Sequence, residues 1–106
     1  MTNTTLFYLW MIVVVLTEVL GDYLFKRWSQ EGGWVLLLLG GLGYFLASLA
    51  WASTLRYEGL VKSLIVFVLA SLFAGVAVGV IIFGEEMTPK TWVALALTVG
   101  ALCLVE

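Results

Sequence analysis

Apolar side chains run along the sequence in four long stretches, separated by three short polar segments. The stretches extend from Leu6 to Phe25, from Trp34 to Leu55, from Leu60 to Phe83 and from Thr88 to Val105. A helix rises about 1.5 Å per residue, so roughly 20 residues cross the hydrocarbon core of a bilayer. No strand-like alternation of apolar and polar residues with turn signals appears. The pattern predicts four membrane-spanning helices, at about residues 6–27, 33–55, 60–83 and 88–105.

The polar segments carry the residues that end and begin helices. Gly32 and Gly33 stop the first predicted helix, and Thr88 before Pro89 is a start signature, with Thr as N-cap and Pro at the first helical position. Helices joined by loops this short must alternate in direction. We therefore expect residues 1–106 to form a single all-α integral membrane domain: a four-helix, up-down-up-down bundle with both termini on the same side.

Composition narrows the class of protein further. The chain is 63% hydrophobic and 11% charged, whereas soluble domains average roughly 45–50% apolar and about 25% charged residues. Membrane lipids are therefore expected partners. The net charge of -2, with no basic run, argues against nucleic acid. With no His and a single Cys, Cys103, we expect no metal, no cofactor and no enzyme activity.

The basic residues do not fix an orientation in the membrane. Lys26, Arg27 and Lys90 fall on one side and Arg56 and Lys62 on the other, so the positive-inside bias is nearly nil. Insertion in both orientations, with pairing of opposite copies, stays open.

Two carboxylates lie inside the first apolar stretch. Glu18 and Asp22 are four residues apart and so share one helix face. An acidic side chain near the bilayer centre costs roughly 2.5–3.5 kcal/mol and usually faces a bundle interior or a wet cavity. Asp22 has an alternative, because it lies near the end of the span and could reach water or pair with Lys26. Glu18 has no such alternative, which predicts that it binds a proton or substrate.

Three further side chains are candidates on the second predicted helix, and one on the third. Tyr44, Ser48 and Trp51 share a face and either line a cavity or pack against a neighbouring helix. Lys62 opens the third helix and could extend outward to water. In an inverted dimer, Lys62 of one copy would instead lie level with Asp22 of the other, where the two could form a gate or a charge pair.

Small residues suggest close helix packing. The third predicted helix carries Ser71, Gly75 and Gly79 at intervals of four, and the fourth carries Ala94, Gly100 and Ala101. Such residues let helix backbones approach each other in membranes. A four-helix unit with polar residues inside also needs a second copy to enclose them, so we expect a homodimer, parallel or antiparallel.

Glu18, Gly21 and Lys26 together resemble the first-helix signature of the small multidrug resistance family, within the drug/metabolite transporter superfamily. Residues 83–88 are similar to the loop before that family's fourth helix. The resemblance implies a four-helix protomer in an antiparallel dimer, in the plasma (inner) membrane of a bacterium or archaeon. It also implies that Glu18 is the coupling carboxylate. Leu64 and Phe67 stand where the family has Tyr and Trp, so the chain resembles a divergent member of that family.

These observations favour a small secondary transporter. It would move a small, cationic or amphipathic solute by proton-coupled alternating access through a cavity that contains Glu18. The alternative is a non-catalytic subunit of a heteromeric membrane complex, or half of a flippase for lipid-linked sugars. The charge of Lys62 and the atypical third helix favour that alternative over a cation exporter.

Overall fold

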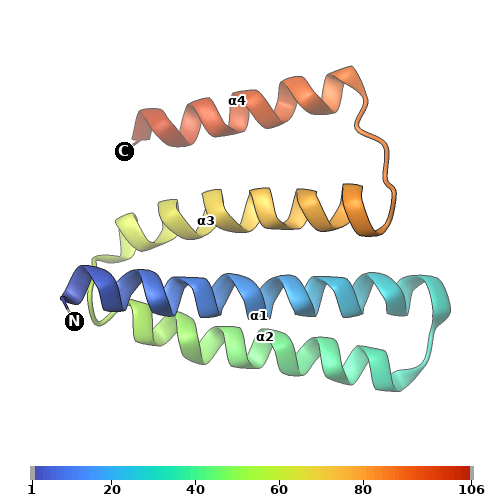
Figure 1. The fold of residues 1–106 in the computed structure, drawn as a ribbon, viewed down its shortest axis with the longest axis horizontal. Helices are drawn as coiled ribbons and strands as arrows, with labels where there is room; N and C mark the ends of the chain where they lie inside the picture. Colours follow the sequence, from blue (N-terminus) through green and yellow to red (C-terminus); the bar gives the residue numbers. More distant parts are fainter. Residues whose placement is uncertain (1, 106) are drawn as a thin grey trace.

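The computed structural model describes residues 2–105, which form four α-helices in chain order (Figure 1). They are α1 (Asn3–Glu31), α2 (Trp34–Thr54), α3 (Leu60–Ala77), continued by the π-helical turn η1 (Val78–Ile82), and α4 (Pro89–Val105). Successive helices run in opposite directions, and both chain ends lie at the left in Figure 1. The all-helical class is confirmed.

Three of these helices are long and apolar enough to cross a membrane: α1, α2 and the continuous segment Leu60–Ile82. The fourth, α4, is apolar but has only 17 residues. At about 1.5 Å per residue it is roughly 25 Å long, a little less than the ~30 Å hydrocarbon thickness.

The first helix is longer than the sequence pattern predicts, since it begins at Asn3 and continues past residue 27 to Glu31. The Thr2 hydroxyl caps its start by accepting a hydrogen bond from the Thr5 amide at 3.1 Å. Near its end, Arg27 pairs with Glu31 one turn later at 2.8 Å. Lys26 and Arg27 end the apolar stretch, but they lie inside the helix and do not end it. The helix ends at Gly32, whose φ of 73° is a backbone conformation that glycine adopts readily.

The first two helices approach each other through glycines. A Cβ on Gly43 of α2 would lie 3.1 Å from the Thr17 carbonyl oxygen and 3.2 Å from the Gly21 Cα of α1. Gly21 and Gly43 are both buried. Because neither residue has a side chain, the two backbones come into direct contact there.

Apolar side chains close one end of the bundle. Phe7, Met11 and Val14 of α1 are buried with Ala50 of α2, and α3 adds partly buried side chains, including Phe67. The Phe67 ring lies 5.3 Å from the ring of Trp51. This cluster holds α3 against the α1/α2 pair.

The last turn of α3 is wider than an α-helical turn. The Phe83 amide donates to the Val78 carbonyl at 3.3 Å, five residues back, and the Glu85 amide donates to the Gly79 carbonyl at 3.0 Å. Glu85 folds over Gly79, where a Cβ would lie 2.6 Å from the Glu85 Oε1. The helix therefore ends at Ile82, one residue before the predicted end.

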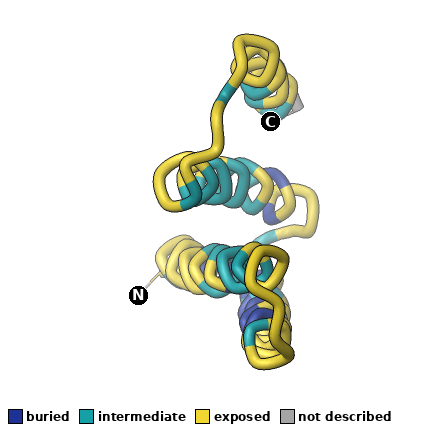
Figure 2. The backbone as a smooth tube through the Cα atoms, turned by 90° about the vertical axis from the view of Figure 1, so that its right-hand side faces the viewer, coloured by how far each residue is buried: buried dark blue, intermediate teal, exposed yellow. Residues whose placement is uncertain are grey.

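The fourth helix stands apart from the other three (Figure 2). It begins as the Thr-Pro pattern predicts, with the Thr91 amide donating to the Thr88 hydroxyl at 3.2 Å. None of its side chains through Leu104 is buried, and Trp92, Leu97 and Leu104 are largely exposed. In this chain α1, α2 and α3 pack together and α4 lies alongside α3, so the expected packing of all four helices into one bundle is not seen.

Candidate functional site

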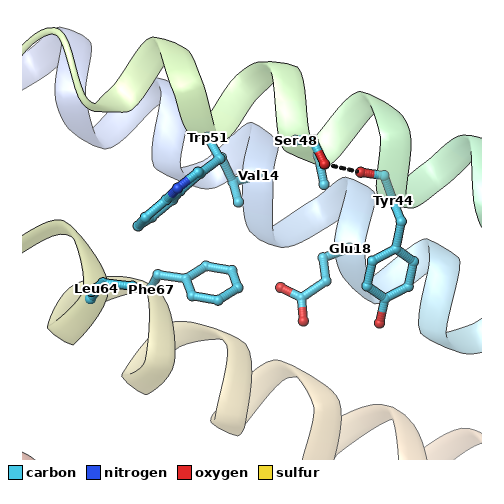
Figure 3. A pocket seen from close by; sticks show the side chains of 8 residues that line it. Val14, Glu18, Tyr44, Ser48, Trp51, Leu64 and Phe67 are labelled. Carbon is cyan, nitrogen blue, oxygen red and sulfur yellow. Dashed lines mark hydrogen bonds between the residues drawn. The ribbon is translucent and has the colours of Figure 1, made fainter. Parts of the chain in front are cut away.

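A cavity of about 330 Å³ lies between the first three helices. Figure 3 shows its lining, which comes from all three of them. The lining residues are Val14 and Glu18 of α1, Tyr44, Ala47, Ser48 and Trp51 of α2, and Leu64 and Phe67 of α3.

Helical spacing explains why these side chains converge. Val14 and Glu18 are four residues apart, and the four α2 residues follow intervals of three, one and three, so each set occupies one helix face. The sequence left two interpretations of Tyr44, Ser48 and Trp51, namely lining a cavity or packing against a neighbouring helix. Both apply to Trp51. It lines the cavity and also packs on Phe67 of the neighbouring helix.

Glu18 is the one acidic residue in the cavity lining. Its carboxylate lies between the rings of Phe67 and Tyr44 (Figure 3). The Ser71 hydroxyl of α3 donates to it, at 3.0 Å from Oε1 and 3.2 Å from Oε2. Across residues 2–105, no Lys or Arg forms an ion pair with Glu18. A carboxylate held by a neutral donor beside aromatic rings can accept a proton or an organic cation.

Asp22 lies beside the cavity and not in its wall. The Tyr44 phenol donates a hydrogen bond to Asp22 Oδ1, while the Tyr44 ring stacks on Phe25 with centroids 5.3 Å apart. Asp22 does not pair with Lys26, which was one alternative from the sequence. Lys26 instead binds Glu85 at 3.4 Å, because the loop after α3 brings that carboxylate to the end of α1.

The structure does not bring Lys62 to the cavity. Its Nζ lies 3.2 Å from Glu58 Oε1, one turn earlier, and 5.8 Å from the centroid of the Phe7 ring. Within one chain, Lys62 is therefore neutralised at the α2–α3 end, away from Glu18 and Asp22.

Small residues of α3 and η1 line a second, shallow groove of about 420 Å³. Ser71, Gly75 and Gly79 form part of it, with Glu85 and Glu86 of the following loop. A Cβ on Gly75 would meet no atom within 4 Å, so no helix of this chain packs on it. On α4, Ala94, Gly100 and Ala101 are exposed.

Sequence reasoning assigned Ser71 to helix packing and missed its contact with Glu18. One signal was present: Ser71 is the one polar side chain between Ser63 and Gly84. A lone hydroxyl in the middle of a long apolar helix needs a partner. As for metals, no three His, Cys, Asp or Glu side chains gather anywhere in residues 2–105.

Comparison with known proteins identifies a relative. A UPF0060 membrane protein from Paraburkholderia phymatum is 30% identical over 96 residues, which are 89% of this chain and 88% of the relative. No family model matches the chain, and no solved structure matches it. With three helices suited to span a bilayer, the chain is a multi-pass integral membrane protein that belongs to the UPF0060 family.

Proposed function

We propose that this protein is a small secondary transporter of the small multidrug resistance type. It works as a dimer in the plasma (inner) membrane of a bacterium or archaeon and exchanges protons for a small cationic or amphipathic solute. One observation carries the proposal. The Glu18 carboxylate lines a cavity walled by aromatic rings, and no basic side chain of the described chain pairs with it.

Proton coupling follows from the single carboxylate. A cation in the cavity is held by the charge of Glu18 and by the faces of Tyr44, Trp51 and Phe67. A proton on Glu18 removes that charge, so proton and cation compete for one group. Exchange results when the cavity opens to the two sides of the membrane in turn.

The size of the cavity favours a small solute. Ligand sites typically measure about 300–1,000 Å³, and this cavity, at about 330 Å³, lies at the lower end. Its polar groups are few, namely Glu18, Ser48, the Tyr44 phenol and the Trp51 indole N–H. Because the Ser48 hydroxyl donates to the Tyr44 carbonyl of its own helix at 3.0 Å (Figure 3), Glu18 is the main polar anchor for a solute.

A second copy would complete the site. Tyr44, Ser48 and Leu64 of the cavity wall are exposed in one chain, and α4 has no buried side chain through Leu104. A homodimer, parallel or antiparallel, would cover both surfaces. The ion pair of Lys62 with Glu58 removes one reason for the alternative, a heteromeric subunit, because that positive charge lies outside the cation cavity.

The test is proton release on cation binding. The purified protein in detergent, weakly buffered, is titrated with guanidinium and with tetraphenylphosphonium, and the pH change is recorded. Wild type and Glu31→Gln, which alters an exposed carboxylate far from the cavity, should release protons on addition of at least one cation, and Glu18→Gln should release none. Equal release from Glu18→Gln and wild type, or no binding of either cation by wild type, would overturn the proposal.

A further inference from the structure

The hydrogen bond between Ser71 and Glu18 joins α3 to α1. Ser71 lies 53 positions after Glu18, and its hydroxyl is nearly equidistant from the two carboxylate oxygens, at 3.0 and 3.2 Å. A hydroxyl has one proton to donate, so it can serve either oxygen. The bond therefore restrains the carboxylate as a whole.

Other helical hydroxyls in this protein behave differently. Ser48, Ser53 and Thr98 each donate to the carbonyl four residues earlier in their own helix, at 3.0, 3.2 and 2.8 Å. This is the usual arrangement for Ser and Thr inside helices. The Ser71 hydroxyl turns instead to a side chain of another helix, which is the arrangement expected of a residue that serves Glu18.

The position of Ser71 along α3 gives the contact a specific geometry. Leu64 and Phe67 line the cavity, Ser71 follows on the same face, and Gly75 and Gly79 continue that face into the groove. Ser71 therefore approaches Glu18 from the groove side. The carboxylate oxygens keep lone pairs directed at the cavity, since two oxygens can accept about four hydrogen bonds.

We infer that Ser71 is a positioning residue for Glu18. Its hydroxyl holds the carboxylate at the wall between the cavity and the groove and favours the ionised form, which is the form that binds a cation. This inference rests on the proposed function, since it assigns Ser71 a part in the same proton–cation exchange.

Few other groups of the described chain could act on the charge of the Glu18 carboxylate. The titratable neighbours of Glu18 are Asp22, one turn along α1, and Tyr44 on α2. On α3 and η1 no charged side chain occurs between Lys62, which is paired with Glu58, and Glu85, which is paired with Lys26. Ser71 is thus the group from α3 that acts on the charge of Glu18.

The experiment measures cation binding as a function of pH for wild type, Ser71→Ala, Ser71→Thr and Ser53→Ala. The probe is whichever of guanidinium and tetraphenylphosphonium the wild type binds. Ser53→Ala is the matched control, because its hydroxyl bonds only its own helix. We expect the midpoint pH for Ser71→Ala to move to more alkaline pH by roughly half to one unit, and Ser71→Thr to return toward wild type.

The outcomes separate the two proposals. A Ser71→Ala profile that coincides with wild type, while Glu18→Gln loses pH-dependent binding, overturns the role of Ser71 and leaves the transporter intact. Persistence of pH-dependent binding in Glu18→Gln overturns the transporter itself. A purely structural role of Ser71 would lower thermal stability without moving the midpoint, so a lower melting temperature with an unchanged midpoint also counts against the inference.

Discussion

Tyr44 connects the two intramembrane carboxylates: its phenol donates to Asp22, while its ring lines the cavity that contains Glu18. The same ring stacks on Phe25 and covers Gly21, where a Cβ would lie 2.7 Å from the Tyr44 Cδ2. One side chain of α2 thus contacts three residues of α1 and also lines the cavity that contains Glu18.

Removal of the Tyr44 hydroxyl should cost stability while preserving the packing of the ring. Tyr44→Phe leaves Asp22 without its donor, and a hydrogen bond to a charged group contributes about 1.5–3 kcal/mol when buried, less at this partly exposed site. We expect a melting temperature in detergent that is lower by a few degrees. Tyr8→Phe is the control, since the Tyr8 hydroxyl has no hydrogen-bond partner among residues 2–105. Equal melting temperatures for Tyr44→Phe and wild type would contradict the prediction.

Gly43 and Gly41 offer a matched pair in α2. Gly43→Ala forces a Cβ to 3.1 Å from the Thr17 carbonyl and 3.2 Å from the Gly21 Cα, so the helices must separate, at a cost of about 1–3 kcal/mol. Gly41→Ala meets nothing within 4 Å and should be neutral or stabilising, because Ala favours helix over Gly by about 0.5–1 kcal/mol. Thermal unfolding in the same detergent compares the two variants. If Gly41→Ala destabilised as much as Gly43→Ala, the close helix contact would not be the cause.

Ser63 should tolerate loss of its hydroxyl. The residue is fully buried, and its Oγ makes no hydrogen bond within the described chain. A buried polar atom without a partner is unfavourable, so Ser63→Ala should leave the unfolding free energy unchanged or raise it by up to about 1 kcal/mol. Thr54→Val, which removes an equally buried hydroxyl that donates to the Trp51 carbonyl at 2.6 Å, should instead destabilise. A loss of stability in Ser63→Ala would point to a partner that one chain does not contain.

Lys62 should be dispensable for cation binding by one chain. Its charge is paired with Glu58 and lies outside the cavity, so Lys62→Gln is expected to bind the cation probe with wild-type affinity. Isothermal titration of the variant and wild type checks this. A large change in affinity would instead support the contact between Lys62 of one copy and Asp22 of another that the sequence suggested.

Much of the architecture was readable from the sequence. Four apolar stretches give four helices because a helix satisfies its own backbone in lipid, and Thr88 with Pro89 marks the start of α4. The length of α1 was harder to predict. Its end is set by the positive φ of Gly32 and not by Lys26 and Arg27, where the apolar pattern stops.

The site was predictable only in part. Glu18 stood out because a charge inside an apolar helix is costly, and helical spacing linked Tyr44, Ser48 and Trp51. The contact of Ser71 with Glu18 depends on how α1 and α3 are rotated against each other, which no single helix encodes. The separation of α4 from the other three helices could not be predicted from the sequence either, because apolar helices in lipid gain little by burying one another.

The order of these elements along the chain separates the cavity wall from the last helix. Every residue of the cavity wall, and Ser71 behind it, precedes residue 72, while α4 begins at Pro89. The wall contributed by one chain is therefore complete without α4. The surface of α4 remains available to lipid or to another copy. A chain that ended before Pro89 would still contain every residue that lines the cavity around Glu18.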